Sequence, residues 1–274
     1  MEYDFASLIT PVIALVVAGA FAGFVSGLLG VGGGIVTVPV MFELFHVLKI
    51  NPDIGMHVAV ATSLATIIPT SIMSGRAHHK RGAVDFDLMK RMAPAAFVGV
   101  IIAAIAGGIF KGVVLSAIFG TVAVIVALYM FFRRDSWRVA QDYPRGVAGA
   151  GVSGGIGFIS ALMGIGGGTL GVPIMSLCNV PVHRAVGTAS ALGLVIGIPG
   201  AIGYIITGWG HPDLPPFSLG YVNLLAAALM LPTILAVVPY GAKVAHSISK
   251  VALQRAFGVF LLITGSRMLS TLFH

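Results

Sequence analysis

The chain has 274 residues, of which 57% are hydrophobic and only 9% are charged, and its mean hydropathy is +1.02. A soluble domain carries about 25% charged residues, so the composition excludes an ordinary soluble fold and predicts an all-α polytopic membrane protein without barrel-type strands. The net charge of +7 does not indicate a nucleic-acid partner, because the basic residues lie in short loops between apolar runs, and the single cysteine excludes an intramolecular disulfide.

About ten apolar segments follow one another along the chain, five in each half. The N-terminus lacks the basic residues of a secretory signal, so we interpret the first segment as a retained membrane span. The second and seventh segments are too short to cross a bilayer comfortably. The segments lie near 9–29, 34–48, 57–75, 92–110 and 113–132, and near 146–163, 168–180, 185–207, 220–240 and 252–271.

The first and second segments are joined by a glycine run that recurs between the sixth and the seventh. GFVSGLLGVGGGIVTVPVM begins at Gly23 and GFISALMGIGGGTLGVPIM at Gly157, and the two share 11 of 19 residues. HVAVAT at His57 and HRAVGT at His183 match in the same order. The chain is therefore an internal duplication, and we expect residues 1–135 and 136–274 to form two membrane repeats.

Each repeat holds an odd number of segments, so the two copies are expected to lie in opposite orientations, as in many secondary transporters. With both termini outside, thirteen of the 16 basic residues fall inside the cell, which agrees with the positive-inside rule. We therefore expect a multi-pass protein of the cytoplasmic membrane. The inside residues are Arg76, Lys80, Arg81, Lys90, Arg91, Arg133, Arg134, Arg138, Arg145, Arg184, Lys243, Lys250 and Arg255.

Each glycine run breaks a membrane helix just before a short segment. Glycine lets a ligand approach the backbone closely, and the exposed N–H groups of a helix start attract anions. We expect the two helix starts to face each other near the midplane and to bind a small anion. The alternative is close helix packing, for which membrane helices also use glycine. The candidate binding residues are Gly32, Gly33, Gly34, Gly166, Gly167 and Gly168.

Hydroxyl residues follow the second matched motif in both halves. Such hydroxyls can donate to an anion, but in membrane helices they usually bond to the preceding helical turn instead. The sequence leaves both roles open. The candidates are Thr62, Ser63, Thr188 and Ser190.

Four titratable or charged side chains are further candidates. His57 and His183 begin matched segments, and each is either a proton-linked switch or a polar residue at a helix start. Arg184 either neutralises an anion or marks the inner membrane interface. Glu43 is the acid most expected within a membrane segment, although its position near the end of a short helix also suits the interface.

GLLGVGGGIVTVP and ALMGIGGGTLGVP, each followed by a His-x-Ala-Val-x-Thr element, resemble the TauE/SafE-type sulfite exporter family of membrane permeases. The resemblance covers nearly the whole chain and both halves. It implies transport of sulfite or of small organosulfur anions such as sulfonates, often as export, without ATP hydrolysis by the chain itself.

Three classes of function follow. The first is a secondary transporter, a class in which inverted repeats are common, coupled to protons or sodium and able to form a homodimer. The second is a passive anion channel, which can share the site without alternating access. The third, an intramembrane enzyme or assembly subunit, needs a reactive cluster, and the segments contain none. We expect no cofactor, no metal and no nucleic-acid partner, with the lipid bilayer and the anion as the partners.

Overall fold

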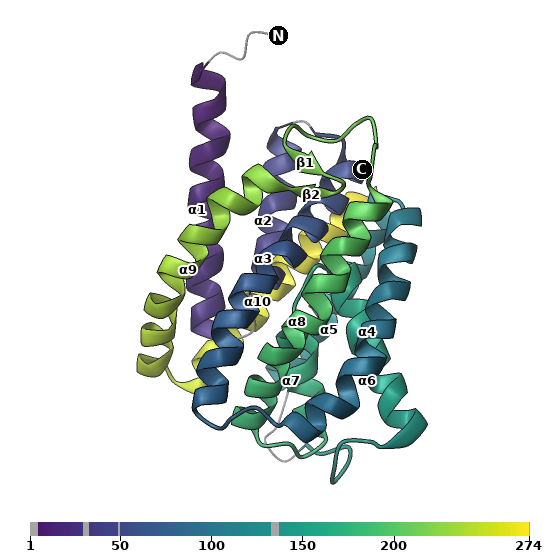
Figure 1. The fold of residues 1–274 in the computed structure, drawn as a ribbon. Helices are drawn as coiled ribbons and strands as arrows, with labels where there is room; N and C mark the ends of the chain where they lie inside the picture. The colour runs from purple at the N-terminus through teal and green to yellow at the C-terminus, as the bar shows by residue number, and fades with distance from the viewer. Residues whose placement is uncertain (1–4, 30–32, 49, 133–136, 274) are drawn as a thin grey trace.

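The computed structural model describes residues 5–29, 33–48, 50–132 and 137–273. In these residues it has ten α-helices and a short β-hairpin (Figure 1). The first half forms α1 (Phe5–Leu29), α2 (Gly34–Val47), α3 (Pro52–Lys80), α4 (Phe86–Ile109) and α5 (Gly112–Phe132). The second half forms α6 (Gly146–Leu162), α7 (Gly167–Leu177), α8 (Val182–Thr207), β1 (Ser218–Leu219), β2 (Val222–Asn223), α9 (Leu224–Ser247), α10 (Lys250–Ser270) and the 3₁₀ turn η1 (Thr271–Phe273).

Each helix overlaps one predicted segment, with several ends shifted by up to seven residues, and the all-α class is confirmed. As expected, α2 and α7 are the short helices, with 14 and 11 residues. Among the described residues, five helices are long and apolar enough to cross a membrane, namely α3, α4, α5, α8 and the Leu224–Gly241 part of α9. The number of crossings stays a prediction.

Side-chain caps fix where several helices begin. The Asn51 side chain accepts a hydrogen bond from Asp53 N at 3.1 Å, and this cap starts α3 before the predicted apolar run begins. The Asp85 carboxylate accepts from Leu88 N at 3.0 Å at the start of α4. The Asn223 side chain does the same for α9, accepting from Ala226 N at 2.8 Å.

The hairpin between α8 and α9 is a feature that the sequence analysis did not foresee. Leu219 pairs with Val222 across a two-residue turn. Gly220 takes the first turn position with φ of +53°, as a type II′ turn requires. Tyr221 N donates to Tyr204 O at 3.2 Å, so the hairpin is fixed to the end of α8.

The helices of the two halves are interleaved. In each half the first helix packs along the fourth helix of the other half, so α1 lies against α9 and α6 lies against α4 (Figure 1). The third helices, α3 and α8, pack against each other, as do the fifth helices, α5 and α10. The short helices α2 and α7 lie on α3 and α8, respectively. Exchanging the two halves therefore leaves this set of helix pairs unchanged.

Matched glycines allow two of these contacts. A Cβ atom on Gly23 of α1 would stand 2.6 Å from the Ile234 carbonyl oxygen of α9. A Cβ atom on Gly157 of α6, the counterpart of Gly23 in the repeat, would collide with the Ala96 carbonyl oxygen of α4. For this pair of glycines, close packing explains the sequence identity.

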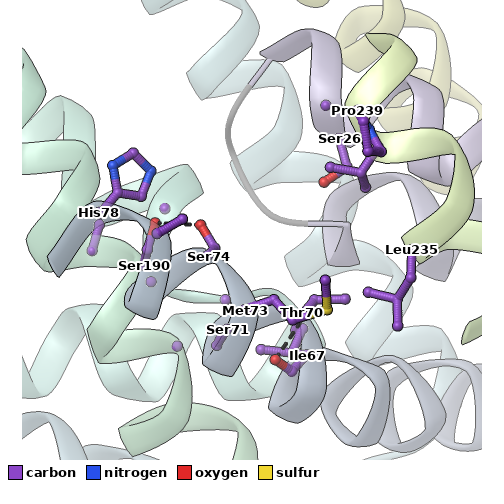
Figure 2. Close-up of a pocket in the computed structure, with 18 residues that line it drawn as sticks. Ser26, Ile67, Thr70, Ser71, Met73, Ser74, His78, Ser190, Leu235 and Pro239 are labelled. Carbon is purple, nitrogen blue, oxygen red and sulfur yellow. Dashed lines mark hydrogen bonds between the residues drawn. The ribbon is translucent and has the colours of Figure 1, made fainter. Parts of the chain in front are cut away.

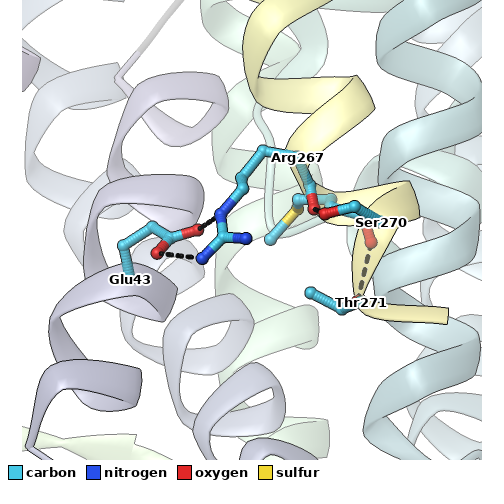
Figure 3. Close-up of polar contacts among 5 residues, drawn as sticks. Glu43, Arg267, Ser270 and Thr271 are labelled. Atoms are coloured by element: carbon cyan, nitrogen blue, oxygen red, sulfur yellow. Dashed lines mark hydrogen bonds and ion pairs between the residues drawn. The ribbon is translucent and has the colours of Figure 1, made fainter. Parts of the chain in front are cut away.

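The molecule has two distinct ends. We call the end with the α3–α4 connection the basic end, because Arg76, Lys80 and Arg81 lie there, and the opposite end the hairpin end (Figure 1). The start of α1 and the end of α10 both lie at the hairpin end (Figure 1). There Arg267 Nε donates to Glu43 Oε1 at 2.9 Å (Figure 3).

Candidate functional site

The two glycine breaks lie against each other inside the fold. Gly34, the first residue of α2, packs against the turn before α7, and a Cβ atom on Gly34 would collide with the Gly164 carbonyl oxygen. Ser63 of α3 donates its hydroxyl to the same Gly164 oxygen at 2.7 Å. Gly33 is buried at the start of α2, whereas Gly32 lies outside the described residues. The break before α7 thus contacts both α2 and α3.

A cavity of about 360 Å³ opens beside the start of α7 (Figure 2). Its inner part is bounded by Ile67 of α3 and by the first residues of α7, and its rim includes Met73 and Ala77, both exposed, near the end of α3. The cavity therefore opens toward the basic end. It is lined by Ser26, Gly27, Ile67, Thr70, Ser71, Met73, Ser74, Ala77, His78, Gly166, Gly167, Gly168, Ala189, Ser190, Gly193, Leu235, Val238 and Pro239.

The lining is apolar with a row of hydroxyl groups, as Figure 2 shows for α3 and α8. Ser74 of α3 donates to Ser190 Oγ of α8 at 3.2 Å, and Ser190 donates to Val186 O at 2.8 Å. Among the described lining residues none is Asp, Glu, Lys or Arg, and His78 is the titratable one. Hydroxyls and a helix start are donors that suit a small anion.

Four of the predicted site residues line this cavity: Gly166, Gly167, Gly168 and Ser190. Gly33, Gly34 and Ser63 are buried beside it without lining it. The sequence analysis missed Ser26 and the α3 residues Thr70, Ser71, Ser74 and His78. A signal for the α3 residues was present, because hydroxyls recur there every three or four positions, which places them along one helix face.

Thr62 and Thr188, the matched threonines, are fully buried and occupy equivalent places outside the cavity lining. Thr62 Oγ1 of α3 accepts a hydrogen bond from Asn223 N at 2.9 Å, at the start of α9. Thr188 Oγ1 of α8 accepts from Asp85 N at 3.0 Å, at the start of α4. Each threonine thus holds the cap residue of the fourth helix of the other half.

The two candidate histidines lie at opposite ends. His57 is buried at the hairpin end, where Nδ1 lies 2.6 Å from Asp53 O and Nε2 lies 2.9 Å from Gly107 O. Carbonyl oxygens only accept, so both ring nitrogens can donate there only when the ring is doubly protonated. His183 is exposed at the basic end, at the start of α8.

The two charged candidates form ion pairs near the surface. Arg184 Nη2 lies 3.2 Å from Asp85 Oδ2 at the basic end, and its side chain is about half exposed, at 49%. Glu43 is held by Arg267 at the hairpin end, as described above. Neither residue lines the cavity beside α7, and both positions fit the interfacial alternative.

Comparison with known proteins identifies the family. The model of the sulfite exporter TauE/SafE family matches residues 15–268, which is nearly the whole chain. The chain belongs to the TauE/SafE family. Both glycine breaks and the cavity of this TauE/SafE protein lie within the matched residues. The resemblance inferred from the doubled glycine motif is thus confirmed.

Several relatives of this TauE/SafE protein are named as probable membrane transporter proteins. One from Haemophilus influenzae is 30% identical over 95% of this chain and 99% of the relative. One from Methanocaldococcus jannaschii is 27% identical over 98% of both chains, and one from Bacillus subtilis is 28% identical over 80% of this chain and 83% of the relative. No solved structure matches the chain. The family and the apolar helices together support a multi-pass membrane protein.

Proposed function

We propose that this TauE/SafE protein is a secondary transporter that exports sulfite or a small organosulfonate from the cytoplasm by alternating access. The observation that carries the proposal is the cavity in which the start of α7 and the hydroxyls of α3 and α8 converge. Backbone N–H groups and hydroxyls provide donors for oxyanion oxygens without placing fixed charge in the membrane.

The size of the cavity limits the substrate. A space of about 360 Å³ is at the lower end of the range for small-molecule sites, which is about 300–1,000 Å³. A compact oxyanion fits this volume and can accept hydrogen bonds from the lining donors, whereas a neutral analogue of similar size lacks the negative charge that the start of α7 favours.

The pattern of helix pairs supports an inverted repeat. An exchange of halves maps the α1–α9 contact onto the α6–α4 contact and the Thr62–Asn223 bond onto the Thr188–Asp85 bond. If the basic end faces the cytoplasm, as the charge distribution predicts, the cavity is open to the inside. An exporter loads its substrate in this state.

Coupling to protons or sodium is part of the proposal. His57 supports proton coupling, because its two ring nitrogens face carbonyl oxygens and a change of protonation alters which bonds they form. The alternative is a passive anion channel with the same cavity. Accumulation of substrate against its gradient distinguishes the two, because a passive channel only dissipates a gradient.

The test uses purified protein in liposomes with sulfite, methanesulfonate and the neutral dimethyl sulfone. We expect concentrative movement of one of the two anions and much weaker binding of the sulfone. Ser190→Ala should weaken anion binding about tenfold, because the Ser190 hydroxyl turns from Val186 O to the anion in the bound state and a hydrogen bond to a charged group is worth about 1.5–3 kcal/mol. Thr207→Val is the matched control, since Thr207 also bonds to the carbonyl four residues earlier in α8 but lies outside the cavity. Equal affinity of Ser190→Ala and the native protein contradicts the site.

A further inference from the structure

Matched residues of the two halves differ in burial in one consistent direction. Ser26 lines the cavity and is half-buried, but its counterpart in the repeat, Ser160, is fully buried at 0% exposure. His78 lines the cavity near the basic end, but at the spacing of the His57 and His183 motifs its counterpart is Tyr204, which is also fully buried. Ser26 and His78 are thus accessible from the cavity, whereas their counterparts Ser160 and Tyr204 are buried.

Both of these buried counterparts carry a hydroxyl group without a hydrogen-bond partner among the described residues. Ser160 Oγ and Tyr204 OH are buried and form no hydrogen bond within the described residues. Buried polar groups are nearly always paired, so an unpaired one needs an explanation. Their counterparts Ser26 and His78 supply the explanation, because these two residues face the cavity in which we place the anion.

Aromatic rings close the space next to Tyr204 at the hairpin end. The Tyr204 and Tyr221 rings form an edge-on contact with centroids 6.4 Å apart. Tyr221 stacks on His57 with centroids 4.8 Å apart. These three residues, which we call the aromatic cap, come from α8, the hairpin and α3. The Tyr204 hydroxyl lies against Gly107 of α4, which has no side chain to form a hydrogen bond with it.

We propose that α6 and α8 carry the second half of the anion pathway, in which the Ser160 and Tyr204 hydroxyls donate to the anion once the aromatic cap opens. This inference rests on the proposed function, because it assigns residues to the alternate state of the same transporter. In that state the hairpin end is open and the cavity beside α7 is closed. The unpaired hydroxyls are the donors that the closed state leaves unused.

Accessibility of single cysteines tests the pathway. In a Cys178→Ala background, Ser26→Cys should react with an impermeant thiol reagent applied at the basic end, and Ser160→Cys only with reagent applied at the hairpin end. Ser153→Cys is the matched control, because Ser153 lies on the same helix and is equally buried, but its hydroxyl is bonded to Gly149 O and Tyr143. It should stay unreactive. Ser160→Cys that reacts only after denaturation, or from the basic end, overturns the proposal.

Removal of the Tyr204 hydroxyl gives a second test. Tyr204→Phe should leave the melting temperature unchanged or raise it, because no hydrogen bond is lost, while the transport rate falls about tenfold. Tyr143→Phe is the control, since its hydroxyl lies 2.8 Å from Ser153 Oγ in the described structure. Its melting temperature should fall and its transport per folded molecule should persist. A transport rate of Tyr204→Phe equal to that of the native protein overturns the role of Tyr204.

The two proposals fail in different ways. If sulfite or methanesulfonate is transported but Ser160→Cys never reacts from the hairpin end, the second half of the pathway is wrong and the function stands. If Ser160→Cys reacts from that end but neither anion binds or moves, the pathway stands and the assigned substrate is wrong.

Discussion

The glycines at the two helix breaks differ in how much space surrounds them. A Cβ atom on Gly33 would stand 3.6 Å from Thr37 Oγ1, and one on Gly166 would stand 3.6 Å from Ile67 Cγ2, both at ordinary contact distance. A Cβ atom on Gly167 would stand only 2.8 Å from the Ala189 carbonyl oxygen, and Gly34 is equally confined by Gly164. Packing therefore explains Gly34 and Gly167, whereas Gly166 has unused space on the cavity side.

Gly166→Ala should weaken anion binding while the protein keeps its melting temperature. The added methyl group enters the cavity beside the first N–H groups of α7, but it meets no backbone atom. Gly33→Ala is the matched control, because it has similar space at the start of α2 but does not line the cavity. Affinity and melting temperature are measured on the same preparations. Equal anion affinity of the two variants would show that the start of α7 does not bind the ligand.

At the scale of helices, Thr62 and Thr188 connect the two halves. The sequence left them as ligands or as residues bonded to their own helix, and the structure gives a third role. Their oxygens accept from backbone N–H groups at the starts of α9 and α4. Loss of a buried acceptor leaves an N–H unpaired, which costs about 1–3 kcal/mol.

Thr62→Val and Thr188→Val should lower the melting temperature and leave anion affinity unchanged. The Thr62 bond is fully buried and the Thr188 bond only partly, so Thr62→Val should have the larger effect. Thermal unfolding in detergent, followed by anion titration of the folded fraction, measures both quantities. An affinity that falls tenfold at an unchanged melting temperature would return these threonines to the binding site.

The sequence predicts where the helices lie along the chain better than it predicts which residues of the two halves contact each other. Apolar runs locate every helix, and the glycine runs locate the starts of α2 and α7, because these signals are local. The predicted end of the third segment, at residue 75, is too early, because α3 continues through polar residues up to Lys80 at the basic end. The partners of Thr62 and Thr188 could not be predicted, because they depend on how the two halves interleave. The cavity residues of α3 could have been predicted from the hydroxyl residues that recur along one face of this helix. The sequence of α2 has no comparable series of hydroxyl residues.

At the scale of the whole molecule, we predict that the hairpin end faces outside and the basic end inside. Single cysteines at Ser218 and Ala77, in a Cys178→Ala background, report on the two ends. An impermeant thiol reagent on intact cells should label position 218 and spare position 77. The native Cys178 is buried, so it contributes little background even when it is retained. The opposite labelling pattern would reverse the orientation and direct the cavity outward.

The cavity lining has a consequence for the energy of the proposed anion transport. The described lining residues include no Lys or Arg, so in the proposed transport the charge of the anion would cross the membrane uncompensated unless a coupling ion crossed with it. A cytoplasm at negative voltage expels an anion with about 2.3 kcal/mol per charge for each 100 mV. This corresponds to an approximately fiftyfold concentration ratio. For an exporter of this kind, the resting voltage of the cell is itself a source of energy for each outward step.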